Sequence, residues 1–175
     1  MIKGIKKWLF YRSFTVDSRR NVQQTHSVNQ LKTVGVLFDG TSESERKLVH
    51  QFKKYISQSG RVEVKSLAFV DNRLPLDNVD YAAFNRTDIN WYGIPSGDKV
   101  SEFIKNNFDL LIILTRKMLP QYEYIIAHST AKFKVGPSIK RAENYLELIV
   151  DLPGDHNTEL LQNNILKALN LVALK

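Results

Sequence analysis

The stretch from Thr33 to Ile56 (TVGVLFDGTSESERKLVHQFKKYI) constrains the fold more than any other part of the chain. Its first six residues, 33–38, are almost continuously apolar, which is typical of a strand buried on both faces of a sheet. After an Asp-Gly turn, Ser42 and Glu45 have the spacing of a capping box, and we predict a helix over 42–58. A strand that runs through a short polar turn into a helix is the unit of open α/β sheets, whose ligands sit just beyond the strand ends.

The rest of the chain continues this alternation of strands and helices. We predict further strands at 62–70, 81–84, 108–114, 131–135 and 145–152, an edge segment at 87–92, and helices at 100–104, 120–128 and 158–173. Ser96 or Asp98 is the expected cap of the second helix, and Gly136-Pro137 the expected end of the fifth strand. The pattern predicts one three-layer, Rossmann-like α/β domain over 31–175, with a mostly parallel sheet of five or six strands and helices on both faces.

Basic residues are concentrated at the N-terminus. The chain has a net charge of +7, and residues 1–20 hold six basic residues and one acid. Within residues 1–12 the spacing predicts a short amphipathic helix, with Ile2, Ile5, Trp8 and Leu9 on one face and Lys3, Lys6 and Lys7 toward the other. A polar linker extends to residue 30. This helix could pack on its own domain, dock to a partner protein, or attach reversibly to the inner face of a membrane.

Several classes of function are not supported by the sequence. The chain has no cysteine, which excludes disulfides, thiolate catalysis and Cys-ligated zinc. No run approaches the roughly 18 to 20 apolar residues that span a bilayer, and we find no cleaved signal. The four histidines lack paired spacing, and no G-x-S-x-G motif is present. We therefore assign no catalytic residue, metal or cofactor, and expect a cytoplasmic protein.

The segment FDLLIILTRKMLPQYEYIIAHSTAKFKVGP, residues 108–137, resembles the N-terminal lobe of heptosyltransferase-like glycosyltransferases. The segments DINWYG at 88–93 and AKFKVG at 131–136 also look like those of an uncharacterised bacterial domain family with the same core. This resemblance covers residues 31–152 and implies a Rossmann-like fold with a reused binding cleft. The glycosyltransferases carry a glycine-rich loop with a Gly-Asp pair, where this chain has Asp39-Gly40 followed by acids, and a second lobe for which 175 residues leave no room. A self-sufficient transferase is therefore not expected.

Two groups at the strand ends are candidates for ligand binding. The first is the turn that contains Asp39, Gly40, Thr41 and Ser42, because backbone N–H groups at a helix N-terminus favour anions. The acids in this turn would repel a phosphate, so a purely structural helix cap is the alternative. The second is Arg116, which follows the strand predicted at 108–114 and could bind an anionic group.

Two further groups are candidates for a partner surface. One is the polar and aromatic cluster Asp88, Asn90, Trp91 and Tyr92, since Trp and Tyr supply rigid contact area. The alternative is that Trp91 only covers the sheet edge. The other is the basic helix, with Lys3, Lys6, Lys7 and Trp8.

Together these features favour a binding or adaptor module without catalytic activity of its own, with a protein of unknown identity as its partner. The first alternative is a degenerate glycosyltransferase-like or nucleotide-binding enzyme domain, which requires a concave pocket that joins Asp39, Thr41 and Arg116. The second is a nucleic-acid-associated factor. It would use the N-terminal basic residues and a second basic group, which otherwise protects an edge strand: Lys132, Lys134, Lys140 and Arg141.

Overall fold

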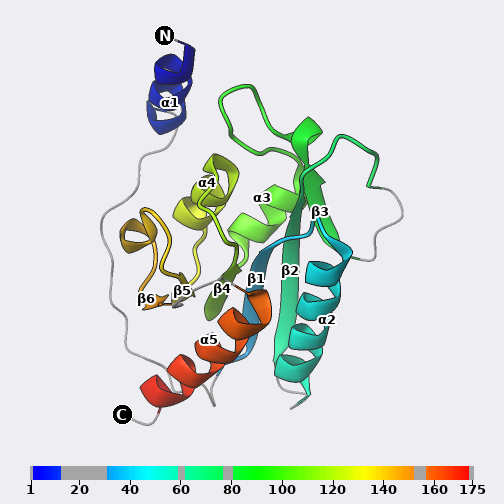
Figure 1. Cartoon of the computed structure of the whole chain (residues 1–175), viewed down its shortest axis with the longest axis vertical. Coiled ribbons are helices and arrows are strands. Elements are labelled where there is room, and N and C mark those ends of the chain that lie inside the picture. The colour runs from blue at the N-terminus through cyan, green and yellow to red at the C-terminus, as the bar shows by residue number, and fades with distance from the viewer. Residues whose placement is uncertain (1, 13–30, 59–61, 77–80, 152–156, 174–175) are drawn as a thin grey trace.

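The computed structural model describes residues 2–12, 31–58, 62–76, 81–151 and 157–173. Its centre is a six-stranded sheet in the order β3-β2-β1-β4-β5-β6, and each pair of neighbouring strands is parallel (Figure 1). The strands are β1 (Thr33–Asp39), β2 (Glu63–Val70), β3 (Ala82–Asn85), β4 (Leu110–Leu114), β5 (Lys134–Pro137) and β6 (Leu148–Val150). The predicted α/β fold with a parallel sheet is confirmed.

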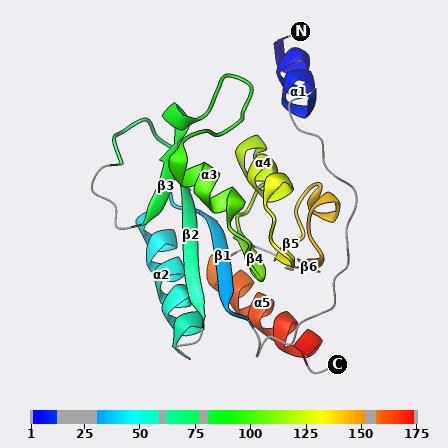
Figure 2. The ribbon, with the colours of Figure 1, turned by 180° about the vertical axis from the view of Figure 1, so that it is seen from behind.

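Helices cover both faces of the sheet, which gives three layers (Figures 1 and 2). One face carries α2 (Glu43–Ser57) and α5 (Thr158–Ala173), and the other carries α3 (Asp98–Lys105) and α4 (Pro120–His128). Successive β1 side chains point to opposite faces, so Val36 and Phe38 enter the core with α2 and α5, whereas Leu37 enters the core with α3 and α4. The two buried faces explain why β4 is apolar throughout and why β1 has no polar side chain between Val34 and Phe38.

Two strands have boundaries that differ from those predicted. The strand expected at 131–135 is β5, and Gly136 and Pro137 belong to it rather than ending it. A Cβ atom on Gly136 would lie 2.9 Å from the Cβ of Ile113, so a glycine is required where β5 packs close to β4. The strand expected at 145–152 is only β6, because a 3₁₀ turn at Ala142–Asn144 precedes it and Tyr145 is buried in the core.

The segment expected as an edge strand at 87–92 is a loop and contains no strand. A 3₁₀ turn at Arg86–Asp88 follows β3, and the side chains of Asn85 and Asp88 each accept a hydrogen bond from the other end of that turn. The helix after this loop, α3, has no side-chain cap: Gly97 precedes it at φ 102°, and the Ser96 hydroxyl instead donates to the Asp88 carbonyl. The predicted caps were therefore wrong.

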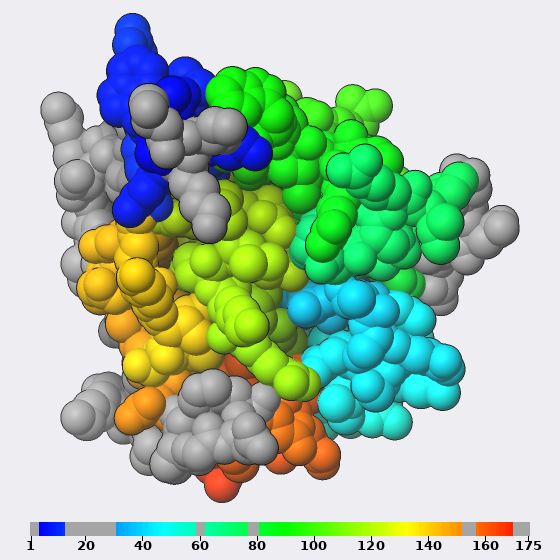
Figure 3. Space-filling view, turned by 45° about the horizontal axis from the view of Figure 1, so that its top comes forward, coloured from blue at the N-terminus to red at the C-terminus, as the bar shows by residue number. Residues whose placement is uncertain are grey.

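The helix α1 (Ile2–Arg12) forms as predicted but packs through the opposite face. Phe10 is buried against the domain, whereas Ile5 and Trp8 are 52% and 56% exposed. Figure 3 shows α1, in blue, against the green segment that follows β3. The predicted linker at 13–30 lies outside the described residues.

Candidate functional site

The first candidate site lies where the chain changes direction in the sheet. The strands β1 and β4 are neighbours, but the chain continues from β1 to β2 on one side and from β4 to β5 on the other. The connections leave the carboxyl ends of these strands toward opposite faces, which opens a gap between them. A hollow of about 350 Å³ occupies this position, and we call it the crevice. Its lining includes Asp39, Thr41, Ser42, Thr115, Arg116 and Tyr122.

Two buried hydroxyl groups in the crevice lack hydrogen-bond partners within the described part of the chain. They are Thr115 Oγ1 and the Tyr122 phenol, on residues that are 2% and 1% exposed. Burial, and then the negative charges of Asp39 and Asp71, raise the pKa of Tyr122, so the phenol remains a proton donor. Buried polar groups in native proteins almost always have a partner, so two unpartnered hydroxyls on residues that line one hollow are unusual.

An ion pair and two hydrogen bonds hold the polar side chains around the crevice in place. The Arg116 Nη2 atom lies 2.5 Å from Glu45 Oε1, which ties the loop after β4 to the first turn of α2. Ser42 Oγ accepts a hydrogen bond from the Glu45 backbone N–H at 3.2 Å, as a helix cap does. One oxygen of Asp39 accepts from the Thr41 backbone N–H at 2.9 Å, and its other oxygen has no hydrogen bond among the described residues. That second oxygen is free to accept from a ligand.

Four of the five predicted ligand-binding candidates meet at the crevice, and Gly40 does not line it. A Cβ atom on Gly40 would lie 2.8 Å from the Cβ of Ala68, so this glycine lets the end of β1 pack against β2. Tyr122 was not singled out from the sequence. The available signal was its position in the first turn of the helix that follows a central strand, the edge at which open sheets bind ligands.

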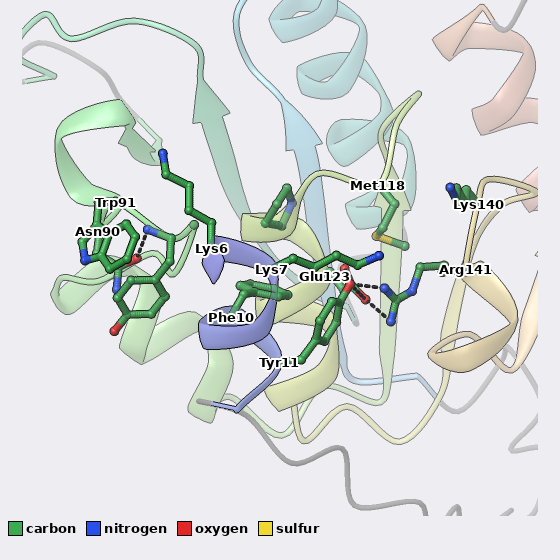
Figure 4. Close-up of a pocket in the computed structure, with 13 residues that line it drawn as sticks. Lys6, Lys7, Phe10, Tyr11, Asn90, Trp91, Met118, Glu123, Lys140 and Arg141 are labelled. Atoms are coloured by element: carbon green, nitrogen blue, oxygen red, sulfur yellow. Dashed lines mark hydrogen bonds and ion pairs between the residues drawn. The ribbon is translucent and has the colours of Figure 1, made fainter. Parts of the chain in front are cut away.

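A second hollow, of about 520 Å³, lies beside α1, and we call it the α1 hollow (Figure 4). It brings together two of the predicted partner surfaces, which are far apart in the sequence: Lys6 and Lys7 with Asn90, Trp91 and Tyr92. Lys140 and Arg141 line it as well. Other members of these groups are elsewhere: Trp8 faces away from the domain, Asp88 caps a turn, and nothing is described of the Lys3 side chain.

A buried carboxylate fixes α1 to the domain at this hollow. Glu123 of α4 is 4% exposed, and it accepts hydrogen bonds from the phenols of Tyr11 at 3.1 Å and Tyr145 at 2.5 Å. The Arg141 Nη2 atom lies 2.9 Å from the same carboxylate. Burial, and then the hydrogen bond to Glu123, raise the pKa of Tyr145, so its phenol stays a donor. The negative charge of Glu123 is therefore neutralised within the protein.

The four residues of the second basic group lie in two different places in the structure. Lys132 Nζ lies 2.7 Å from Asp109 Oδ1, and Lys134 Nζ donates to the Ile126 carbonyl, so both lysines are used within the fold. The interpretation of these lysines as protection of an edge strand was wrong, because Lys132 precedes β5 and β5 lies between β4 and β6. Lys140 and Arg141 alone reach the α1 hollow.

The described residues contain neither a metal cluster nor a membrane-spanning helix. No group of three or more His, Asp or Glu side chains there is arranged to hold a metal ion. Among the same residues, no helix combines the length and apolar character needed to cross a membrane.

Comparison with known families gives one match. The family model described as "Family of unknown function (DUF6913)" matches residues 7–172. No curated protein matches the chain. The match supports an uncharacterised domain family, whereas the resemblance to heptosyltransferase-like glycosyltransferases and the bacterial origin stay predictions.

Proposed function

We propose that this chain, which belongs to the family of unknown function DUF6913, is a binding module that holds a small hydroxyl-rich molecule in the crevice. The observation that carries the proposal is that two residues lining the hollow, Thr115 and Tyr122, have buried hydroxyls without partners among the described residues. Leaving such groups unsatisfied costs about 1 to 3 kcal/mol each. That cost is offset when a ligand supplies the missing hydrogen bonds.

The donors and acceptors of the crevice point to the carbohydrate and polyol class. Asp39 offers a carboxylate oxygen that accepts from a ligand hydroxyl, and Tyr122 offers a phenol that donates to one. The Thr115 hydroxyl can do either. A molecule with adjacent hydroxyl groups meets all three at once, because each of its hydroxyls both donates and accepts.

The charges and the size of the crevice restrict which carbohydrates or polyols it can bind. Arg116 is occupied by Glu45, and the negative charge of Asp39 offsets the positive charge of Lys117, which also lines the crevice. The described lining therefore has no excess positive charge that would favour a phosphate. The volume of about 350 Å³ is near the lower end of the range for ligand pockets, about 300 to 1,000 Å³, and suits a single sugar ring. The ion pair between Arg116 and Glu45 closes one side and helps to fix the shape before binding.

The proposal is tested by titrating the ¹⁵N-labelled full chain with ribose, glucose, mannose and inositol at millimolar concentrations. We expect saturable amide shifts at Thr41, Thr115 and Arg116 with at least one of them, and much weaker binding by Asp39→Asn. The control is Asp98→Asn, an exposed carboxylate outside the crevice. The absence of saturable shifts from all four molecules, or equal binding by Asp39→Asn and the unchanged protein, would overturn the proposal.

The same hollow favours one second candidate, a domain that also transforms its ligand. An enzyme at this edge of the sheet requires a concave pocket that joins Asp39, Thr41 and Arg116, and all three line the crevice. Asp39 would then act as the base that accepts a proton from a ligand hydroxyl. The ligand spectrum recorded during the same titration separates the two candidates: an unchanged sugar supports binding alone, and a new species supports an enzyme.

A further inference from the structure

We propose that the α1 hollow binds a short single-stranded nucleic-acid segment, with one base stacked on Trp91 and the backbone phosphates held by Lys6, Lys7 and Lys140. This site is separate from the crevice and does not depend on the function proposed for it. Three observations carry the inference: an exposed tryptophan on a hydrogen-bonded turn, three lysines without partners among the described residues, and a hollow with apolar and aromatic walls that they all line.

Trp91 is exposed on a turn that is held firmly in place. The Asn90 side-chain oxygen accepts from the backbone N–H groups of Tyr92 and Ile94, at 3.3 and 2.9 Å, and the Gly93 N–H donates to the Asn90 carbonyl at 3.0 Å. The ring of Tyr92 lies edge-on to that of Trp91, with centroids 5.3 Å apart. The Trp91 side chain is nevertheless 59% exposed. A large ring fixed in this way loses little conformational entropy when a base stacks on it.

The cations beside Trp91 have no counter-ions in the part of the chain that the structure describes. Lys6, Lys7 and Lys140 line the hollow, and none of them forms an ion pair or a hydrogen bond within the described residues. Glu123, the one acid among the described lining residues, is already bound by Arg141 and two phenols. The hollow therefore has an excess of positive charge, which favours a ligand that carries several negative charges.

The arrangement of the cations favours a strand over an isolated phosphate. In Figure 4, Lys6 extends on the side of Trp91, Lys7 points toward Glu123, and Lys140 lies beyond Arg141, so the three lysines are spread across the hollow and are not gathered at one point. Separated cations beside an aromatic platform suit the backbone of a single-stranded nucleic acid, whose phosphates are separated in the same way. The hollow, of about 520 Å³, is large enough to hold a nucleotide unit beside Trp91.

Nucleic-acid binding at the α1 hollow is tested by fluorescence anisotropy of the full chain with a labelled hexauridylate RNA. We expect saturable binding whose logarithmic affinity falls linearly with the logarithm of salt concentration. The double variant Lys6→Glu/Lys7→Glu should lose at least tenfold in affinity. The matched control is Lys54→Glu/Lys167→Glu, which makes the same charge change at exposed positions of α2 and α5. It should lose less than twofold. Equal losses in the two double variants would overturn the site, as would undetectable binding at low salt.

Two further arms identify the source of the ligand. Trp91→Ala should lose roughly tenfold in affinity and leave the salt dependence unchanged, since stacking is not ionic. An unchanged affinity in this variant would overturn the stacking role. Uridine monophosphate should compete far more weakly than the hexamer; equal competition would overturn the strand and assign the hollow to a free nucleotide. Displacement of the RNA by phosphatidylglycerol vesicles, with binding to vesicles unaffected by Trp91→Ala, would overturn the site in favour of a lipid surface.

Discussion

Tyr11 and Glu123 are 112 positions apart in the sequence, and the phenol of Tyr11 donates a hydrogen bond of 3.1 Å to the buried carboxylate of Glu123. This contact joins α1 to α4 across a segment that lies outside the described residues. Arg141 contacts both groups, since its guanidinium also lies 4.5 Å from the centroid of the Tyr11 ring. The N-terminal helix is therefore part of the folded domain through a specific polar cluster as well as through Phe10.

Removal of the Tyr11 hydroxyl should destabilise the protein. In Tyr11→Phe, the buried Glu123 carboxylate loses a donor, and we expect the free energy of unfolding in urea to fall by about 1 to 2 kcal/mol. Tyr55→Phe is the matched control, because Tyr55 is exposed on α2, and it should have no measurable effect. Equal effects of the two variants would contradict the contact between Tyr11 and Glu123.

Removal of the Thr115 hydroxyl should stabilise the unliganded protein. Thr115→Val deletes a buried hydroxyl without a described partner, and we expect the free energy of unfolding to rise by about 1 kcal/mol while sugar binding weakens. The same substitution at Thr33 gives the contrast. The Thr33 hydroxyl is bonded to Asp109, so Thr33→Val should be destabilising. A loss of stability in Thr115→Val would show that this hydroxyl already has a partner.

The carboxylate of Asp109 should make stability depend on acid pH. Burial acts to raise its pKa, but hydrogen bonds from Lys132 and from the backbone N–H groups of Lys32 and Thr33 outweigh it and lower the pKa from 3.8 to about 2. A lowered pKa contributes stability at pH values above the unfolded pKa, and this contribution is lost as the pH falls from about 4 to about 2. We expect a contribution of about 1 kcal/mol, since the pair with Lys132 is partly exposed to solvent.

Urea unfolding of Asp109→Asn at a series of pH values checks this expectation. The variant should be less stable than the unchanged protein at neutral pH and should converge with it near about pH 2, where Asp109 is half protonated in the folded protein. Glu102→Gln removes an exposed carboxylate on α3. Its free energy of unfolding should depend on pH in the same way as that of the unchanged protein. A constant difference between Asp109→Asn and the unchanged protein over the whole acid range would contradict the lowered pKa.

A methyl group at position 136 should be costly. In Gly136→Ala, the new Cβ would lie 2.9 Å from Ile113 Cβ and 3.0 Å from Leu146 Cδ1, so β5 or β4 has to shift. Overpacking of this kind typically costs about 1 to 3 kcal/mol in the free energy of unfolding. Gly4→Ala is the control, because nothing lies within 4 Å of the corresponding Cβ in α1, and a gain of up to about 1 kcal/mol is expected from helix propensity. A neutral Gly136→Ala would mean that the two strands pack less closely than described.

The parts of the fold that the sequence predicts well are those that local chemistry determines. The start of α2 follows from Ser42, which caps it, although the predicted capping box is half formed because the Glu45 side chain pairs with Arg116. The strands β1 and β4 follow from apolar runs that only a doubly covered sheet can bury. The register of β5 could not be predicted in this way. Gly136 resembles a turn residue, and its actual role is to give room to Ile113 of the neighbouring strand.

In the candidate sites as well, some residues could be predicted from local sequence and others depend on tertiary packing. Asp39, Thr41 and Arg116 were predictable because parallel strands end at one edge of the sheet. The α1 hollow was not predictable as one site, since Lys7 and Trp91 meet only through tertiary packing. The packed face of α1 also could not be read from its apolar pattern, because the partner of Tyr11 is a carboxylate in a distant helix.

The first turn of α4 places two consecutive side chains at the two candidate sites. Tyr122 lines the crevice, and Glu123 lines the α1 hollow and holds α1. A ligand that moves this turn when it bonds to Tyr122 changes the position of Glu123 as well. Any resulting change in affinity at the α1 hollow has to be matched by an equal change at the crevice, because a coupling free energy between two sites is reciprocal. If both sites bind ligands, this shared turn is the element through which binding at one would affect the other.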